Sequence, residues 1–290
     1  MYSPVAFFCF NRPYHTKQSI QALSNNKEAK YTDLYAFIDG HKEISQIHLI
    51  DAVEKIVLSY EDKFKSLNII RSNINLSSAV SQRRGLSEVL KNHETVINLE
   101  DDVIVSQYFL SYMNKALNKY MNDSNVWHIN GYSYPVNFES EYDCFFIRLM
   151  LCWGWGTWRD RWEKFNNDPL AQDPFYIMSL FNKKLKKEFD LNITNGSWWV
   201  QVEENAAGKL KNTWDIFWYA YIFLNKGLCL TPKYSLSNNI GLDGSGIHCS
   251  EVKNNFYFSE ISNSIEIKSF PEKVFSFILL AYKKYLFSCI

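Results

Sequence analysis

In Val96-Ile97-Asn98-Leu99-Glu100-Asp101-Asp102-Val103, a short apolar run ends abruptly in three consecutive carboxylates. Like charges at adjacent positions repel each other, and burying them is costly unless a positive group compensates. A strand that carries such a cluster at its carboxyl end places it where open α/β sheets bind ligands. A divalent metal is the obvious compensator, because it prefers oxygen ligands and often shares them with the phosphates of a nucleotide. The alternative is a surface turn whose acidic side chains are simply solvated.

Apolar runs alternate with helical patterns on both sides of this stretch. We expect strands at residues 5–10, 34–38, 67–70 and 96–99, and helices at 16–23, 49–60, 78–90 and 109–121. Strands that alternate with helices indicate βαβ units and a mostly parallel sheet covered on both faces. The sequence therefore predicts an α/β fold of this kind.

The second half of the chain loses this rhythm. We expect strands at 126–130, 144–151 and 228–230, helices at 169–189 and 215–224, and a flexible glycine-containing stretch at 238–248. Neither a repeat nor a linker interrupts the chain, which favours one compact domain. Within it we expect a nucleotide-sugar half (1–125), an acceptor-binding and catalytic half (126–250) and a C-terminal segment (251–290).

Composition narrows the function classes. The 290 residues carry a formal net charge of zero, so the balance of acidic and basic residues does not favour nucleic acid as a partner. The six cysteines are scattered without metal-binding spacing, which is typical of a reducing, cytoplasmic setting. The N-terminus does not read as a signal peptide, and no apolar stretch is long enough to cross a bilayer.

Three further features are expected at the same edge of the sheet as the acidic triplet. Arg12 follows the first strand, Asp39 ends the second, and Arg83 and Arg84 lie on the helix before the acidic strand. Alone, such residues are more often caps or turn residues. Together with the triplet they outline a site for a nucleotide diphosphate and a metal.

These segments resemble a known family. Phe10-Asn11-Arg12-Pro13, Phe37-Ile38-Asp39-Gly40, Arg84-Gly85-Leu86 and the triplet with its flanks are similar to the nucleotide-sugar half of GT-A glycosyltransferases. The similarity is greatest to the N-acetylglucosaminyltransferase I type, with its Glu-Asp-Asp version of the DXD motif. The resemblance covers roughly residues 4–250. It implies a GT-A fold, Mn²⁺ or Mg²⁺, and inverting transfer of a hexosyl or N-acetylhexosaminyl group from a nucleotide sugar, for which we expect a UDP-linked donor.

The resemblance also implies roles for individual residues. Asp102 would bind the metal directly, whereas Glu100 and Asp101 would hold the sugar, the ribose or metal-bound waters. Arg12 and Asp39 would contact the nucleoside end of the donor. Arg84 is a further candidate for donor binding.

The sequence is shorter than the family's members, and we expect no N-terminal membrane anchor, so neither their Golgi setting nor their acceptor is implied. We expect instead a bacterial enzyme of surface polysaccharide or lipopolysaccharide synthesis.

An inverting displacement needs a base that takes the proton of the acceptor hydroxyl. Asp215 is the candidate, because it begins an apolar helix whose N-terminal dipole favours a charged carboxylate. The alternative is that it only caps this helix. The rival bases are Asp160, Glu203 and Glu204.

Two segments keep two interpretations each. His248 ends a glycine-containing stretch and is a candidate for a further metal ligand, or an ordinary loop residue. Residues 153–156 (Trp-Gly-Trp-Gly) form either an acceptor platform or packed core.

The C-terminal residues 270–290 mix aromatic and basic side chains, so they either lie on a membrane surface or pack against the protein. A lipid-linked oligosaccharide is an acceptor that would explain membrane contact.

Two other functions remain open at this point. One is a metal-dependent nucleotidyltransferase or phosphohydrolase on a similar sheet, although the chain has neither a glycine-rich phosphate loop nor a second acidic cluster. The other is a non-catalytic carbohydrate-binding protein.

Overall fold

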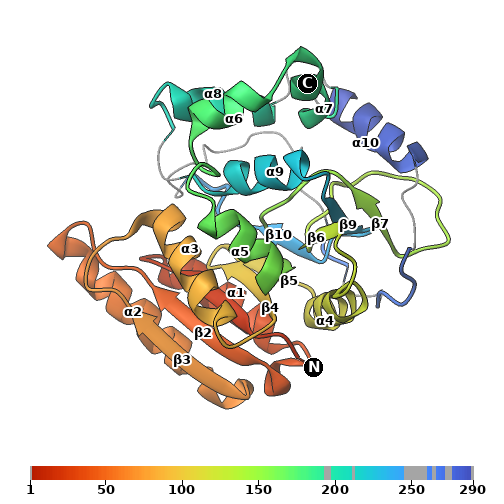
Figure 1. Cartoon of the computed structure of the whole chain (residues 1–290). Helices are drawn as coiled ribbons and strands as arrows, with labels where there is room; N and C mark the ends of the chain where they lie inside the picture. The colour runs from red at the N-terminus through yellow and green to blue at the C-terminus, as the bar shows by residue number, and fades with distance from the viewer. Residues whose placement is uncertain are drawn as a thin grey trace.

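The computed structural model describes residues 2–192, 197–210, 213–244, 260–262, 266–271 and 276–288. Its centre is a sheet in the order β3-β2-β1-β4-β8-β6-β9-β7 (Figure 1). The strands of this sheet are β1 (Val5–Cys9), β2 (Asp33–Ile38), β3 (Ser66–Arg71), β4 (Thr95–Glu100), β6 (Val126–Asn130), β7 (Cys144–Ile147), β8 (Trp155–Trp158) and β9 (Leu228–Pro232). A separate antiparallel ribbon joins β5 (Val103–Val105) to β10 (Ser237–Asn239).

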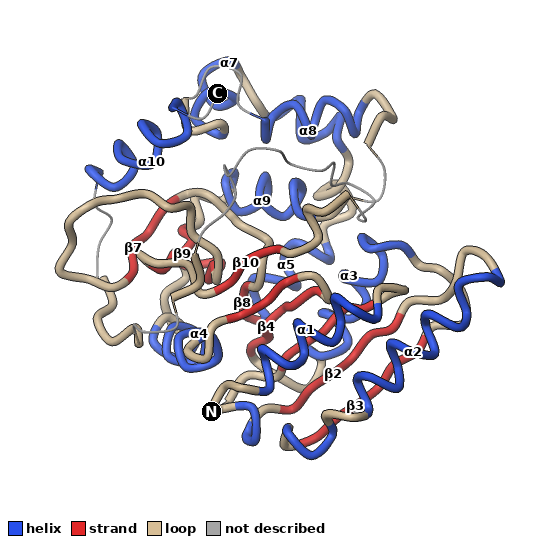
Figure 2. Tube along the Cα trace, turned by 180° about the vertical axis from the view of Figure 1, so that it is seen from behind, coloured by secondary structure: helices blue, strands red, loops and turns tan. Residues whose placement is uncertain are grey.

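Helices cover both faces of the sheet, as Figure 1 and the reverse view in Figure 2 show. Alternate side chains of β1 face opposite ways: Phe7 packs with α1, α2 and α4, whereas Phe8 packs with α3, α5 and α9. The bounds of these helices are α1 (Pro13–Ser24), α2 (Ile47–Leu58), α3 (Ser77–Leu90), α4 (Phe109–Lys119), α5 (Arg159–Asn167) and α9 (Asp215–Leu224). The predicted α/β class is confirmed.

The strand directions determine where the site residues meet. β3, β2, β1 and β4 run parallel, and Phe8 of β1 lies beside Glu100 of β4. The loops that follow β1, β2 and β4 therefore all leave the sheet at the carboxyl ends of these strands, which we call the carboxyl edge of the sheet. β8 runs antiparallel between β4 and β6 and joins the two halves of the chain in one sheet.

Several elements differ from the sequence prediction. The helix expected at 169–189 is interrupted, giving α6 (Pro174–Leu180) and α7 (Lys183–Phe189). The break falls at Asn182, whose side chain accepts hydrogen bonds from two backbone N–H groups and so starts α7. The strand expected at 144–151 ends at Ile147, and the expected flexible stretch at 238–248 begins inside β10.

The C-terminal helix α10 (Ser276–Ser288) packs against the protein along one face. Ile278, Tyr282 and Leu286 are buried, and the Tyr282 hydroxyl lies 2.7 Å from Ser133 Oγ. This arrangement confirms the packing interpretation for that face and leaves contact of its other face with a membrane as a prediction. Within the described residues, no helix combines the length and hydrophobicity needed to cross a bilayer.

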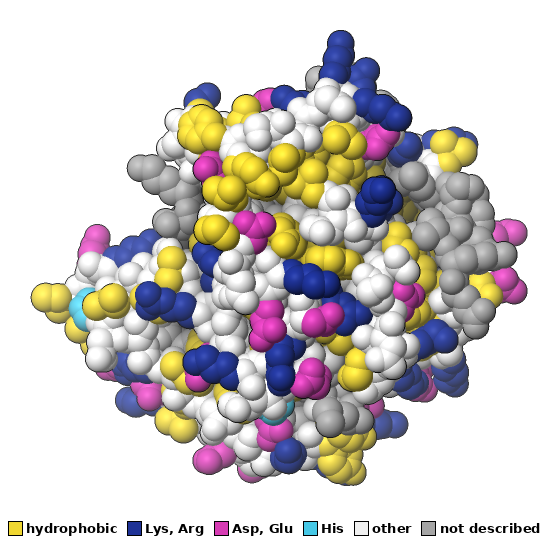
Figure 3. All heavy atoms as spheres, viewed as in Figure 1, with side chains coloured by type: hydrophobic (Ala, Val, Ile, Leu, Met, Phe, Trp, Pro, Cys, Tyr) yellow, Lys and Arg dark blue, Asp and Glu magenta, His cyan; other side chains and the backbone are white. Residues whose placement is uncertain are grey.

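Hydrophobic side chains also gather on the surface at the end of the molecule formed by α6 and α8 (Ser197–Ala206) (Figure 3). Phe175 of α6 and Val200 of α8 are both exposed there.

His128 of β6 is buried in a way that fixes its protonation state. Its ring stacks on Trp155, with 4.8 Å between centroids. Nδ1 accepts a hydrogen bond from Trp218 Nε1 at 3.2 Å, and Nε2 lies 3.2 Å from the carbonyl oxygen of Leu151. Nδ1 therefore carries no proton. Burial lowers the pKa of His128 from about 6.5 to about 3.

We predict that this histidine contributes to acid sensitivity. Because the pKa is depressed in the folded state, its contribution to stability is full above pH 6.5 and is lost as the pH falls towards 3. The free energy of unfolding of wild type should therefore fall between pH 6.5 and 4 more steeply than that of His128→Gln, by up to about 1.4 kcal/mol per pH unit. His48→Gln, at an exposed position, should follow wild type in urea titrations across this range. Parallel curves for wild type and His128→Gln would contradict the assignment.

Candidate active site

The acidic triplet lies at the carboxyl end of β4, beside the loop that leaves the neighbouring β1. That loop holds Arg12, which directly precedes Pro13 at the first position of α1. Arg12 Nη2 lies 2.6 Å from Asp101 Oδ1 and 2.8 Å from Asp102 Oδ2. One guanidinium nitrogen therefore bridges two consecutive carboxylates.

Backbone contacts hold the two aspartates in place. Asp101 is buried, its second carboxylate oxygen accepts a 3.2 Å hydrogen bond from Phe10 N–H, and its carbonyl accepts one from Ser19 Oγ. Burial raises the pKa of Asp101, and Arg12 opposes this effect. Burial alone would lower the pKa of Arg12, but the two aspartates outweigh it and raise the pKa overall. The pair thus compensates charges that would be expensive to bury singly.

The residues after β10 pass directly over the triplet, and we call residues 240–244 the strap. Ile240 N–H donates to the carbonyl of Asp102 at 2.8 Å. A Cβ at Gly241 would collide with Asp102 Oδ2 and lie 3.0 Å from Arg12 Nη1, so only glycine allows this approach. Further along, Asp243 Oδ2 lies 3.2 Å from His15 Nε2 on α1.

Glu100 and Asp215 are far apart in sequence, yet their charges lie close enough to influence each other. Burial, Asp102, Asp101 and Asp215, in that order, raise the pKa of Glu100 well above its ordinary value. The pKa of Cys152 is raised by burial and then by Asp215 and Glu100. Asp215 is half-buried in the first turn of α9. The structure therefore brings the predicted base into electrostatic contact with the acidic triplet.

Asp39 already has its hydrogen bonds filled by the backbone. Oδ1 accepts from Gly40 and Leu76, and Oδ2 accepts from Ser77, at 2.8–3.1 Å. Burial raises its pKa, and these hydrogen bonds oppose the shift. Asp39 joins the end of β2 to the start of α3, and its contact with a nucleoside stays a prediction.

The other predicted residues lie elsewhere or outside the described part. Arg84 is exposed on α3 and has no ion pair within the described ranges, whereas the neighbouring Arg83 binds Asn166 of α5. Asp160 is exposed and pairs with Arg161 at 2.6 Å. Glu203 accepts a 2.5 Å hydrogen bond from Trp199 Nε1 on the same helix. His248 lies outside the described residues.

Sequence reasoning did not identify Cys152 or the role of Gly241. The glycines of 238–248 were interpreted as a source of flexibility, whereas Gly241 permits a close approach. Of the two interpretations of residues 153–156, packed core applies to Trp155, which is fully buried in β8.

The carboxylates have the chemistry of a site for a hard divalent cation. Two carboxylates, Asp101 and Asp102, pair with one guanidinium, so the site keeps negative charge in excess. Carboxylate oxygens are ligands of Mg²⁺ and Mn²⁺. Among the described residues, no three His, Cys, Asp or Glu side chains converge to hold a metal alone. A cation bound here would need further ligands, which a diphosphate and water can supply.

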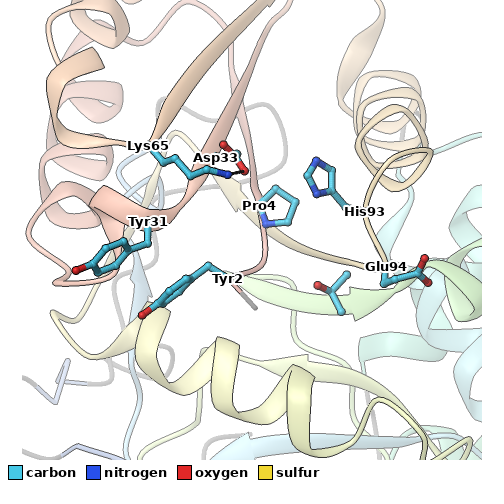
Figure 4. A pocket seen from close by; sticks show the side chains of 8 residues that line it. Tyr2, Pro4, Tyr31, Asp33, Lys65, His93 and Glu94 are labelled. Atoms are coloured by element: carbon cyan, nitrogen blue, oxygen red, sulfur yellow. Dashed lines mark hydrogen bonds and ion pairs between the residues drawn. The ribbon is translucent and has the colours of Figure 1, made fainter.

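A separate hollow of about 380 Å³ lies at the opposite edge of the sheet, by the amino ends of β2 and β4 (Figure 4). Tyr2 and Tyr31 line it and stack on each other. Its charged groups already have partners: Lys65 pairs with Asp33 at 2.8 Å, and Glu94 pairs with Arg159. It is therefore a weaker candidate than the acidic edge.

No family model and no curated protein matches this sequence. Among solved structures, Staphylococcus aureus TarS is similar with a TM-score of 0.46 and 11% identity, over 82% of this chain and 36% of TarS. Galactosyltransferase LgtC, solved with donor and acceptor sugar analogs, gives 0.40 and 12%, over 76% and 70% of the two chains. A Bacillus anthracis protein described as a glucose-1-phosphate thymidylyltransferase gives 0.41 and 12%, over 82% and 90%. At such low scores the similarity assigns neither a family nor a function.

We predict that Asp39→Asn destabilises the fold. The amide group would turn an N–H towards one of the three backbone donors, leaving a buried group unsatisfied at a cost of about 1–3 kcal/mol. Asp33→Asn, at the other end of β2, breaks an ion pair with the exposed Lys65 and should cost about 1 kcal/mol or less. Urea unfolding of both variants measures the difference. An equal decrease in the free energy of unfolding for the two variants would mean that the Asp39 hydrogen bonds contribute no more to stability than the Asp33–Lys65 ion pair.

Proposed function

We propose that this chain is a glycosyltransferase that moves a sugar from a UDP-linked donor to a glycan or glycolipid acceptor, with inversion. The observation that carries the proposal is the position of Glu100, Asp101 and Asp102 at the carboxyl end of β4, with the charge of Asp215 within range of Glu100. Ligands bind at this edge in open α/β sheets. Inverting glycosyl transfer requires carboxylates that bind a cation and a separate carboxylate that accepts a proton.

Different residues would bind the cation and the donor. Asp102 would hold Mn²⁺ or Mg²⁺, and when bound the cation neutralises the charge that develops on the leaving diphosphate. Glu100 and Asp101 would orient the sugar or bound water, and Arg12, Asp39 and Arg84 would contact the rest of the donor. These roles follow from the resemblance in sequence.

Asp215 would accept the proton of the acceptor hydroxyl as its oxygen forms a bond to the anomeric carbon and the bond to the diphosphate breaks. Its electrostatic contact with Glu100 supports this choice. The rivals lack that support: Asp160 is exposed on α5 and paired with Arg161, and Glu203 is bonded to Trp199. His248 is retained as a proposed further ligand of the cation.

We place this activity in bacterial surface polysaccharide or lipopolysaccharide synthesis, at the inner face of the cytoplasmic membrane. A lipid-linked oligosaccharide would suit an enzyme that touches this membrane. Residues 270–290 are the proposed contact, through the face of α10 that carries the exposed Leu280 and Lys284. Screening sugar nucleotides with Mn²⁺ for nucleotide release would identify the donor. Release of pyrophosphate from nucleoside triphosphates would favour a nucleotidyltransferase instead.

We predict that Asp102→Ala abolishes cation-dependent donor binding and leaves the fold intact. Asp102 lies at the end of β4 and not within the apolar core, so a lost ligand should cost affinity more than packing. In a thermal shift assay, UDP and Mn²⁺ together should raise the melting temperature of wild type, and neither should do so alone. The melting temperature of the variant should not rise even with both. Asp62→Ala, at an exposed site, is the control and should behave as wild type. An unchanged Mn²⁺ dependence in Asp102→Ala would remove Asp102 from the metal site.

We predict that Asp215→Asn lowers the transfer rate by roughly 10²–10⁴-fold, the range expected for loss of a positioned base. The amide keeps the shape of the side chain, and Asp215 is the first residue of α9 after the N-cap Trp214, so UDP-donor affinity and melting temperature should change little. Asp160→Asn is the control and should retain its rate. A rate for Asp215→Asn within a few-fold of wild type would exclude Asp215 as the base.

A further inference from the structure

We propose that Arg12 is the resident counter-ion of the acidic triplet and competes with a divalent cation for Asp102. This inference rests on the proposed function, because that function brings the cation to Asp102. It adds a competition between the protein's own positive charge and the cation.

The carboxylate oxygen that Arg12 binds is enclosed on two sides. Arg12 Nη2 lies 2.8 Å from Asp102 Oδ2, and Gly241 of the strap packs against the same oxygen. A Mg²⁺ ion binds its oxygen ligands at about 2.0–2.1 Å and keeps several waters around it. A cation on Oδ2 would therefore lie against the guanidinium, with like charges in contact.

Arg12 cannot leave by losing its proton, because the guanidinium stays charged in proteins. Its pKa is moreover raised here by Asp101 and Asp102, which outweigh the effect of burial. A cation on Oδ2 therefore requires the side chain to move. Arg12 Nη1 is buried without a hydrogen-bond partner among the described residues, so the guanidinium can turn and keep Asp101 through both nitrogens. The same nitrogen could also reach a phosphate oxygen of the donor.

The consequence is a lower cation affinity in the absence of donor. The cation must displace a charge-assisted hydrogen bond worth about 1.5–3 kcal/mol, which corresponds to roughly tenfold or more in affinity. Once a diphosphate supplies new partners for both the cation and Arg12, this penalty is offset. Cation and donor should therefore bind with mutual assistance.

The test measures the affinity for Mn²⁺ in the absence of nucleotide for wild type, Arg12→Gln and Arg71→Gln. Electron paramagnetic resonance reports the concentration of free Mn²⁺ during each titration. Arg71 is the matched control, because it also bridges two carboxylates, Asp51 and Glu54, but on the surface of α2. We expect Arg12→Gln to bind Mn²⁺ about tenfold tighter than wild type and Arg71→Gln to be unchanged. Arg12→Gln should also be less stable without Mn²⁺ and gain more in melting temperature when it is added.

Equal or weaker Mn²⁺ binding by Arg12→Gln would overturn the competition. If Arg12→Gln fails to fold, Arg12→Lys provides the test, because a single ammonium cannot bridge both aspartates as the guanidinium does. Tighter Mn²⁺ binding by Arg12→Lys than by wild type supports the proposal, and unchanged binding contradicts it. Failure of the proposed function is a different result: no variant would bind Mn²⁺ even with UDP present.

Discussion

The ion pairs of Arg12 with Asp101 and Asp102 are the interaction on which the rest of the site depends. Consecutive carboxylates at the end of a buried strand would repel each other, and a guanidinium from the neighbouring loop compensates them. This requirement fixes the loop after β1 beside the end of β4. It also brings the strap close, because Gly241 leaves room for the backbone against Asp102. The same pairs leave the triplet with excess negative charge, which a divalent cation would balance.

The second constraint is the antiparallel strand β8, which connects the two halves of the sheet. Its Trp155 is fully buried, stacks on His128 of β6 and contacts Trp214, the residue before Asp215. Aromatic packing therefore sets the start of α9, and with it the carboxylate proposed as base, relative to β4. The position of Asp215 thus depends on core residues for which no catalytic role is proposed.

The sequence predicted the first half well because its strands contain short apolar runs, fully buried in β1 and nearly so in β4, that alternate with helical patterns. The helix that starts at Asp215 was also predicted, as an apolar helix over residues 215–224. β8 was missed because Trp155 and Gly156 lack the alternation of a half-buried strand. The bond between Arg12 and the triplet was not predicted either, since pairing between residues about 90 positions apart depends on strand order, which no local pattern contains.

A crystal structure with UDP and Mn²⁺ would show whether a nucleotide sugar binds over the acidic triplet. We expect the diphosphate and the cation at the carboxyl ends of β1 and β4, with the cation on Asp102 and Arg12 turned away from it. UDP bound instead in the hollow beside Tyr2 and Tyr31, at the opposite edge of the sheet, would contradict this expectation.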